Sequence, residues 1–325
     1  MKTTRRQILP LVAATTCLGT PAIGYAQTYP ARPVRIIAPF SPGGAVDAVA
    51  RKVAQKLTEQ IGQQFFVENK TGATGTIGMA EVARAAPDGL TLLAIDTTYS
   101  MVPHVFHRLP WDHANGFAPI TDSARGRTVL VVRDGLPIRT FSEFVDYARR
   151  NPEKLTFGSA GVGSVLHFYA EGLMMEAGIR CFHVPYRGAG DAMIAMLAGQ
   201  IDFAVAPTAA TIEHVRGGKM RALAVTGDSR SPFVPEVPTF AEVGQPQFSP
   251  MYWTGLAAPA GTPAAVTTRL RQEVLRSFEA EDMKDFLAAQ VAEKGGLTPE
   301  DLTRLIRTET DHWGHVAAQA RIERQ

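Results

Sequence analysis

Two glycine-rich turns hold the residues best suited to binding a small anion. Each turn lies between an apolar run and a helical pattern. In the first turn, the adjacent glycines Gly43 and Gly44 permit positive φ and let a ligand approach the backbone. A helix that starts at such a turn offers unpaired N–H groups and the positive end of its dipole to a carboxylate. The turns comprise Ser41, Pro42, Gly43, Gly44, Ala45, Val46 and Asp47, and Gly158, Ser159, Ala160, Gly161, Val162, Gly163 and Ser164.

The first turn permits two interpretations. Asp47 falls in the first turn of the helix expected from Ala45, where the helix dipole stabilises an acid. Arg51 follows four residues later as a helical partner of Asp47. The segment is therefore either a carboxylate site or a tight turn with a capping acid and no ligand, and residue chemistry leaves both open.

The second turn can hold the other end of a ligand through its backbone amides and the hydroxyls of Ser159 and Ser164. His167 follows one turn into the next helix, where it either packs or contacts the ligand. The turn is not a dinucleotide fingerprint, because G-x-G-x-x-G would need glycine where the chain has Leu166. It is not a nucleophile elbow either, because G-x-S-x-G is absent.

The remaining polar patterns predict no metal, cofactor or catalysis. The glycines of residues 72–78 lack the lysine of a phosphate-binding loop, and no local signature places a nucleophile beside a base. We therefore predict a binding protein and not an enzyme. Three candidate metal-ligand pairs each lack a third ligand at a recognised zinc spacing: His104 and His107, His312 and His315, and Cys181 and His183.

The turns lie within a pattern of alternating strands and helices. Short apolar runs alternate with amphipathic helical patterns, which predicts βαβ units and a mostly parallel sheet. This alternation of strands and helices occurs twice along the chain, which favours two domains of similar architecture over one long sheet. Strands are expected at residues 34–39, 64–68, 91–96, 128–132, 155–158, 181–184, 202–206, 221–226 and 253–258. Helices are expected at residues 45–61, 77–86, 141–150, 165–177, 189–198, 208–217, 263–278, 282–290 and 299–318.

Two extended segments divide the chain into lobes. Residues 116–127 run extended before one apolar strand, and the proline- and glycine-rich residues 231–250 precede another. Two crossings imply that the C-terminal part returns to the first lobe. We predict a discontinuous first lobe of residues 27–127 and 249–325 and a second lobe of residues 128–248. The cleft between two such lobes is where ligands usually bind, and it closes about its hinges.

The N-terminus reads as an export signal of residues 1–26. Lys2, Arg5 and Arg6 precede a short apolar run, and small residues lead to a cleavage site after Ala26. The arginine pair is compatible with a twin-arginine or an ordinary Sec signal. Cys181 would then be the single cysteine of the mature chain, so the fold must rest on its core and not on an internal disulfide.

Charge excludes one class of partner. The whole chain has a formal charge of +2, and the signal carries three cations without an acid, so the mature chain is close to −1. A nucleic-acid-binding protein would show a basic excess or a basic stripe, and neither is present in the sequence.

Motifs along the mature chain resemble one family. The opening Tyr29-Pro-x-Arg-Pro-Val-Arg-Ile-Ile-x-Pro-Phe-x-Pro-Gly-Gly-x-x-Asp47 is similar to that of the Bug receptors, the extracytoplasmic solute-binding proteins of tripartite tricarboxylate transporters. Further matching blocks are residues 67–72, 85–92, 117–120, 157–161, 183–188, 221–226 and 256–263.

The resemblance implies a periplasmic-binding-protein type II-like fold, two α/β lobes joined by two hinge crossings with a ligand cleft between them. It implies a periplasmic monomer that captures a small organic carboxylate and delivers it to membrane permease subunits. Family members hold the carboxylate largely through backbone amides of cleft loops. Carried over by position, the binding residues are Ser41, Gly43, Gly44, Ala45, Asp47, Thr97, Thr98, Ser159, Ala160, Gly161, Gly163, Ser164, His167, Pro207 and Thr208.

The ligand loops depart from the family pattern, so the identity of the bound acid cannot be inferred from that of any relative. Residues 96–99 read Asp-Thr-Thr-Tyr where relatives often have Ser-Gly-Thr-His, and residues 204–207 replace a frequent Phe-Asp-Asn. Asp96 either caps the next turn or favours a ligand with an amino group. Two alternatives to a transport receptor stay open: a secreted hydrolase-like enzyme on the same cleft, and an orphan ligand sensor without a permease.

Overall fold

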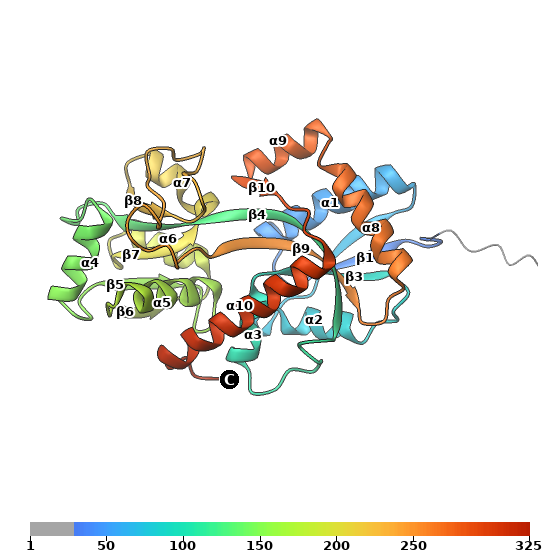
Figure 1. Ribbon diagram of the computed structural model, residues 1–325, viewed down its shortest axis with the longest axis horizontal. Coiled ribbons are helices and arrows are strands. Elements are labelled where there is room, and N and C mark those ends of the chain that lie inside the picture. Colours follow the sequence, from blue (N-terminus) through green and yellow to red (C-terminus); the bar gives the residue numbers. More distant parts are fainter. Residues whose placement is uncertain (1–28) are drawn as a thin grey trace, which may run out of the picture.

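The computed structural model describes residues 29–325, and the predicted export signal and its cleavage site lie outside these residues. Two α/β lobes lie side by side along the long axis of the molecule, and strands β4 (Phe117–Arg133) and β9 (Met251–Pro259) run between them (Figure 1). The predicted two-lobed fold with two crossings is therefore confirmed.

The sheet of the first lobe combines parallel and antiparallel strands. β1 pairs in parallel with β2 and β3, whereas β9 runs antiparallel to both β3 and β4. The prediction of a mostly parallel sheet was wrong here, because the two crossing strands travel in opposite directions and pair with each other. Besides β4 and β9, its strands are β1 (Val34–Ala38), β2 (Phe65–Asn69), β3 (Thr91–Asp96) and β10 (Ala292–Lys294).

The second lobe repeats the arrangement around the other half of β4. β5 pairs in parallel with β6 and β7, and β7 and β8 run antiparallel to β4. β4 therefore serves both lobes, and hydrogen bonding is continuous from β2 through β4 to β6. The strands of this lobe are β5 (Thr156–Ser159), β6 (Phe182–Pro185), β7 (Phe203–Pro207) and β8 (Met220–Val225).

The helices follow from their apolar periodicity. In α1 the predicted apolar positions Val46, Val49, Val53 and Leu57 are all buried against the first sheet. The first-lobe segments form α1 (Ala45–Ile61), the 3-10 turn η1 (Ala73–Gly75), α2 (Thr76–Ala83), α3 (Thr98–Val105), α8 (Ala264–Ser277), α9 (Glu281–Ala289) and α10 (Pro299–Gln319). The second-lobe segments form α4 (Phe141–Arg150), α5 (Val165–Ala177), α6 (Ala189–Leu197) and α7 (Thr208–Arg216).

Two local expectations were wrong. Residues 117–127 are extended as predicted, but they are not a linker before a strand. They belong to β4, which spans both lobes because each half pairs with a different sheet. The helix α3 follows β3 almost directly, where only a loop was expected. Thr98 and the internal Pro103 give a weak helical signal, and burial of Tyr99, Met101 and Val105 stabilises the helix instead.

The long C-terminal helix α10 touches the cores of both lobes. Leu302 and Ile306 join the first-lobe cluster that contains Trp253. Farther along, Trp313 packs on Phe168 and Tyr169 of α5, in the main core cluster of the second lobe. The predicted lobe limits of residues 27–127, 249–325 and 128–248 stay a prediction.

Among residues 29–325, no helix has both the length and the apolar character needed to cross a bilayer.

Candidate ligand-binding cleft

A cavity of about 800 Å³ lies between the lobes and is lined by both. Its wall combines three kinds of structure: a row of side chains on the strands, the first residues of several helices, and the crossing segment from Ala124 to Arg127. Such a cavity between two lobes suits a small ligand.

The floor of the cavity is a row of side chains on neighbouring strands. Asp96 of β3 lies opposite Thr254 of β9, and Thr254 lies opposite Ala124 of β4. Two residues along, Tyr252 lies opposite Gly126. All five line the cavity, because residues two apart on a strand share one face of the sheet.

The rest of the wall is made of helix N-termini. The cavity is lined by the first residues of α1 at Gly44 and Ala45, of α5 at Ser164 and Val165, and of α7 at Thr208. The N-terminus of α6, at residues 188–190, joins them. For α1, α6 and α7 no side chain caps the helix start. Their free N–H groups and dipoles therefore create a region that attracts an anion.

In the first predicted turn, Gly44 and Ala45 line the cavity, whereas Ser41 and Gly43 are exposed beside it. Asp47 is buried and faces the turn itself. Its carboxylate accepts hydrogen bonds from the Gly43 N–H at 2.9 Å, from Arg51 Nε at 3.0 Å and from Asn69 Nδ2 at 2.7 Å.

Burial alone would raise the pKa of Asp47, but these hydrogen bonds outweigh it and lower the pKa. Asp47 therefore shapes the turn as an ionised structural acid. The interpretation of Asp47 as a capping acid agrees with this geometry. Gly44 and Ala45 are the residues of the turn whose backbone lies at the cavity.

In the second turn, Ala160 and Ser164 line the cavity, and Ser159, Gly161 and Gly163 do not. Ser159 is fully buried, with its Oγ 2.6 Å from His183 Nε2 and accepting from the Gly161 N–H at 3.1 Å. These bonds fix the shape of the turn from behind.

His167 is a packing residue. Its Nδ1 accepts from the Gly163 N–H at 3.1 Å, and its ring stacks on His183 with centroids 3.9 Å apart. Burial, together with the neighbouring His167, lowers the pKa of His183 to about 4. The stacked imidazoles therefore lie behind the turn and outside the cavity wall.

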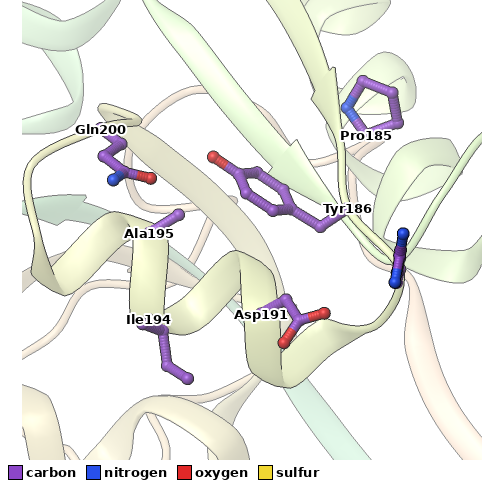
Figure 2. A pocket seen from close by; sticks show the side chains of 7 residues that line it. Pro185, Tyr186, Asp191, Ile194, Ala195 and Gln200 are labelled. Carbon is purple, nitrogen blue, oxygen red and sulfur yellow. The ribbon is translucent and has the colours of Figure 1, made fainter.

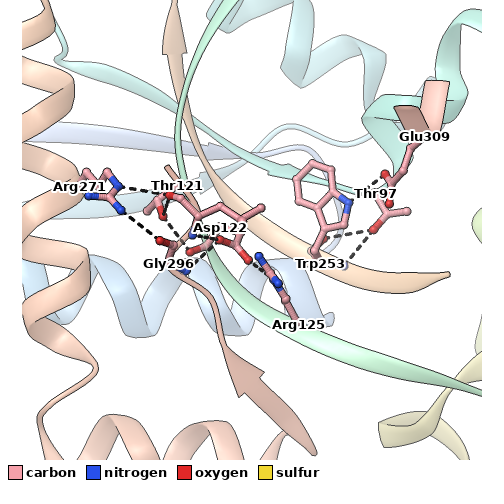
Figure 3. Close-up of polar contacts among 9 residues, drawn as sticks. Thr97, Thr121, Asp122, Arg125, Trp253, Arg271, Gly296 and Glu309 are labelled. Carbon is pink, nitrogen blue, oxygen red and sulfur yellow. Dashed lines mark hydrogen bonds and ion pairs between the residues drawn. The ribbon is translucent and has the colours of Figure 1, made fainter. Parts of the chain in front are cut away.

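The third predicted loop is divided in the same way. Thr98 lines the cavity, whereas Thr97 is fully buried and binds the backbone of Trp253, accepting from its N–H at 2.9 Å. Figure 3 shows Thr97 beside Trp253, whose indole N–H donates to Glu309 of α10 at 3.0 Å. These contacts join the start of α3 to β9, and β9 to α10.

Pro207 and Thr208, from the fourth predicted loop, both line the cavity. The Thr208 hydroxyl donates to the Arg127 carbonyl at 2.9 Å. The start of α7 is thereby fixed to the strand that crosses between the lobes.

Asp96 is both a local cap and part of the cavity wall. Its side chain is 2% exposed, and Oδ2 accepts from the hydroxyl of Thr98 at 2.9 Å and from that of Tyr252 at 3.4 Å. Oδ1 is buried without a hydrogen-bond partner in the described structure. Burial raises the pKa of this carboxyl to about 7.

Several lining residues escaped the sequence predictions. Tyr252 and Thr254 lie more than 150 residues from Asp96 in the chain, so only strand pairing brings them together. The Arg187-Gly-Ala-Gly190 turn was detectable, because it precedes a helix as the two predicted turns do. Asp122 fixes the strand behind the floor, accepting from the N–H groups of Gly296 and Leu297 and from Arg125 (Figure 3).

A second depression of about 550 Å³ lies on one lobe only, between β6 and α6. Figure 2 shows the Tyr186 ring lying across it toward Ala195 and Gln200, with Asp191 at the start of α6. It has neither the converging helix starts nor the contribution from both lobes that mark the cleft. Within residues 29–325, no cluster of three or more histidine, cysteine, aspartate or glutamate side chains is arranged to hold a metal.

Two lobes, two crossing strands and an intervening cleft define a solute-binding protein of the periplasmic type. Solved structures support this class: the chain superimposes on "Structure of a periplasmic transporter" with a TM-score of 0.80 and 35% identity, covering 91% of this chain and 99% of that one. The chain belongs to the tripartite tricarboxylate transporter family receptors, which it matches over residues 49–321. These are periplasmic solute-binding proteins, and the resemblance to Bug receptors is confirmed.

Relatives extend along nearly the whole chain. The "UPF0065 protein in tcbD-tcbE intergenic region" of Pseudomonas sp. (strain P51) is 36% identical over 98% of this chain and 95% of its own. Protein BugT of Bordetella pertussis is 31% identical over 90% of this chain and 91% of its own. A Rhodopseudomonas palustris structure with bound malate, MatC, has a TM-score of 0.77 and 31% identity, covering 89% of this chain and 99% of that one.

Proposed function

We propose that this protein is an extracytoplasmic receptor that binds a small organic carboxylate in the cleft and delivers it to permease subunits of a tripartite tricarboxylate transporter. The observation that carries the proposal is the convergence of the starts of α1, α5, α6 and α7 on one cavity. Helix N-termini bind anions without a cationic side chain. The malate of MatC and the adipate of the R. palustris structure "Rpa4515 with adipate" are ligands of the same chemical kind in relatives.

We assign the binding role to the predicted residues in two groups. Gly44, Ala45, Thr98, Ala160, Ser164, Pro207 and Thr208 line the cavity and contact the ligand. Ser41, Gly43, Asp47, Thr97, Ser159, Gly161, Gly163 and His167 hold those residues in place. Ligand binding then closes the lobes, residues 27–127 with 249–325 on one side and 128–248 on the other, about the β4 and β9 crossings.

A cavity-filling variant tests the site. Ala160→Trp places a large ring in the cleft, and Ala241→Trp adds the same ring at an exposed position outside it. Calorimetric titration with mono-, di- and tricarboxylates should show binding to the wild type and to Ala241→Trp, and about a hundredfold weaker binding to Ala160→Trp. Equal affinities in all three proteins, or no binding of any acid by folded wild type, would disprove the proposal.

Export and assembly complete the proposal. The signal of residues 1–26 directs the chain to the periplasm by the Sec or the twin-arginine route, and mass spectrometry of the periplasmic protein should find Gln27 at its N-terminus. We propose a monomer, which light scattering after size exclusion measures directly. A receptor without its own permease would bind ligand but leave uptake unchanged when its gene is deleted.

The geometry of the site gives little support to the alternative of a hydrolase-like enzyme. Ser159 and His183 are within hydrogen-bond distance, but Ser159 is fully buried and its hydroxyl also serves the Gly161 turn. A nucleophile must reach its substrate. Recovery of unchanged ligand after long incubation is therefore the expected result, and turnover would favour the hydrolase.

A further inference from the structure

The floor of the cleft carries an acid, Asp96, with one carboxylate oxygen that has no hydrogen-bond partner in the described structure. Asp96 lines the cavity and is 2% exposed, and its Oδ1 lacks a partner in the described structure. Beside it, on the paired strand, the hydroxyl of Thr254 is likewise buried without a partner. Unpaired buried polar atoms are costly, so two of them on one cavity wall indicate that a ligand supplies their partners.

No protein cation balances Asp96. Its other oxygen accepts from the hydroxyls of Thr98 and Tyr252, and the backbone N–H of Thr98 also stabilises the carboxylate. Within residues 29–325, the carboxylate forms no ion pair with lysine, arginine or histidine. The titratable groups coupled to it include Glu309 of α10 and Tyr169 of α5, and neither brings positive charge. Arg125 and Arg127 of β4 also line the cavity, but they pair with Asp122 and Glu293 instead. Burial raises the pKa of Glu309 to about 7, and Asp96 adds to this increase. The floor is therefore the acidic end of the cleft.

The rest of the cavity wall attracts negative charge. The uncapped starts of α1, α6 and α7 face it, and the exposed Arg187 lines it without an ion pair in the described part of the chain. Backbone N–H groups, helix dipoles and a guanidinium all favour an anion. One cavity thus presents an anion site and an uncompensated acid.

We infer that the ligand is an amino-substituted carboxylate, with its carboxylate at the helix starts and its ammonium group on Asp96 Oδ1 and Thr254 Oγ1. This inference rests on the proposed function and narrows its ligand class. The ammonium supplies the positive charge that the floor lacks, and its three N–H groups suit acceptor atoms on adjacent strands. A plain dicarboxylate would instead set a second negative charge against Asp96.

Pairs of acids that differ only by an amino group test the inference. The pairs are propionate and alanine, succinate and aspartate, glutarate and glutamate, adipate and 2-aminoadipate, and 3-phenylpropionate and phenylalanine. Calorimetry on the wild type should show tighter binding of the amino member of the best-fitting pair, by about tenfold or more. Asp96→Asn keeps the shape and removes the charge, so it should abolish or reverse that preference. Asp146→Asn, an exposed acid on α4, is the matched control and should keep it.

The outcomes separate this inference from the proposed function. Binding of organic acids without an amino preference, or an equal preference in wild type and Asp96→Asn, overturns the inference and leaves the receptor standing. Failure of every acid to bind the folded wild type overturns both.

The pH dependence of ligand affinity distinguishes an ionised Asp96 that pairs with an ammonium group from a neutral Asp96 that donates a hydrogen bond. Pairing with an ammonium needs the ionised acid, so affinity for the amino ligand should rise between about pH 5.5 and 7.5, where an amino group keeps its proton. The Asp96→Asn variant should lose this slope. Affinity for the amino ligand that instead falls over the same range in the wild type, but not in Asp96→Asn, would show that Asp96 acts as a neutral hydrogen-bond donor, which overturns the inference.

Discussion

The two glycine turns look alike in the sequence but are built differently. The first lies open: Ser41, Gly43 and Gly44 are exposed, and a side chain at Gly43 would meet no atom within 4 Å. The second is packed from behind: Gly163 is buried, and a Cβ there would lie 2.7 Å from the Val105 methyl groups of α3.

The difference teaches how each turn keeps its shape. The first relies on one ionised acid, Asp47, which binds the turn from within its own lobe. The second relies on close packing against α3 and on the stacked rings of His167 and His183. Both turns bring a helix start to the cavity, but different forces hold them there, and substitutions should reveal this.

The largest effect is expected from Gly163→Ala. The residue has φ +77°, which costs a non-glycine residue about 1–2 kcal/mol, and the added methyl group overlaps Val105 at a similar further cost. We expect a loss of about 3 kcal/mol in the free energy of unfolding, measured with urea. Gly43→Ala is the matched control: its φ of +83° is similar but its surroundings are open, so a loss of only about 1 kcal/mol is expected. Equal losses would contradict the difference in packing.

A smaller loss is expected from Asp47→Asn. The amide replaces one acceptor oxygen by a donor, so a hydrogen bond from Gly43, Arg51 or Asn69 is lost, at about 2 kcal/mol near neutral pH. Since the folded pKa of Asp47 is lowered, its contribution is complete above the ordinary aspartate pKa of about 3.9 and disappears as the pH falls through the folded value. Urea unfolding at several pH values should show wild type and variant converge in acid. A constant difference would argue against the ionised cap.

The smallest effect is expected from His183→Gln, at about 1 kcal/mol near neutral pH, since glutamine can still bind Ser159. Burial and His167 lower the folded pKa of His183 to about 4. The unfolded chain therefore binds a proton first, and the wild type should lose stability as the pH falls from about 6.5 toward the folded value. The variant should lose less over this range. Identical slopes would show that His183 does not titrate in this way.

Local elements were predictable because their signals are local. The helices at residues 45–61, 141–150 and 165–177 have the predicted bounds. In α4 and α5 the caps Thr140 and Ser164 also mark the start, each accepting from an N–H three residues later. The weakly helical α3 was missed because its stability comes from the packing of Tyr99, Met101 and Val105 and not from propensity.

The sequence by itself determined the alternation of strands and helices, the two crossings between the lobes and the turns that start α1 and α5. These depend on residues close together in the chain, where periodicity and glycine act directly. Only the tertiary structure decided which atoms of those turns face the cleft. It also decided that Asp96 and Thr254 share one floor, because strand register joins residues that no local pattern relates. Ser159 and His167 look like ligand residues in sequence, yet packing turns both away from the cavity.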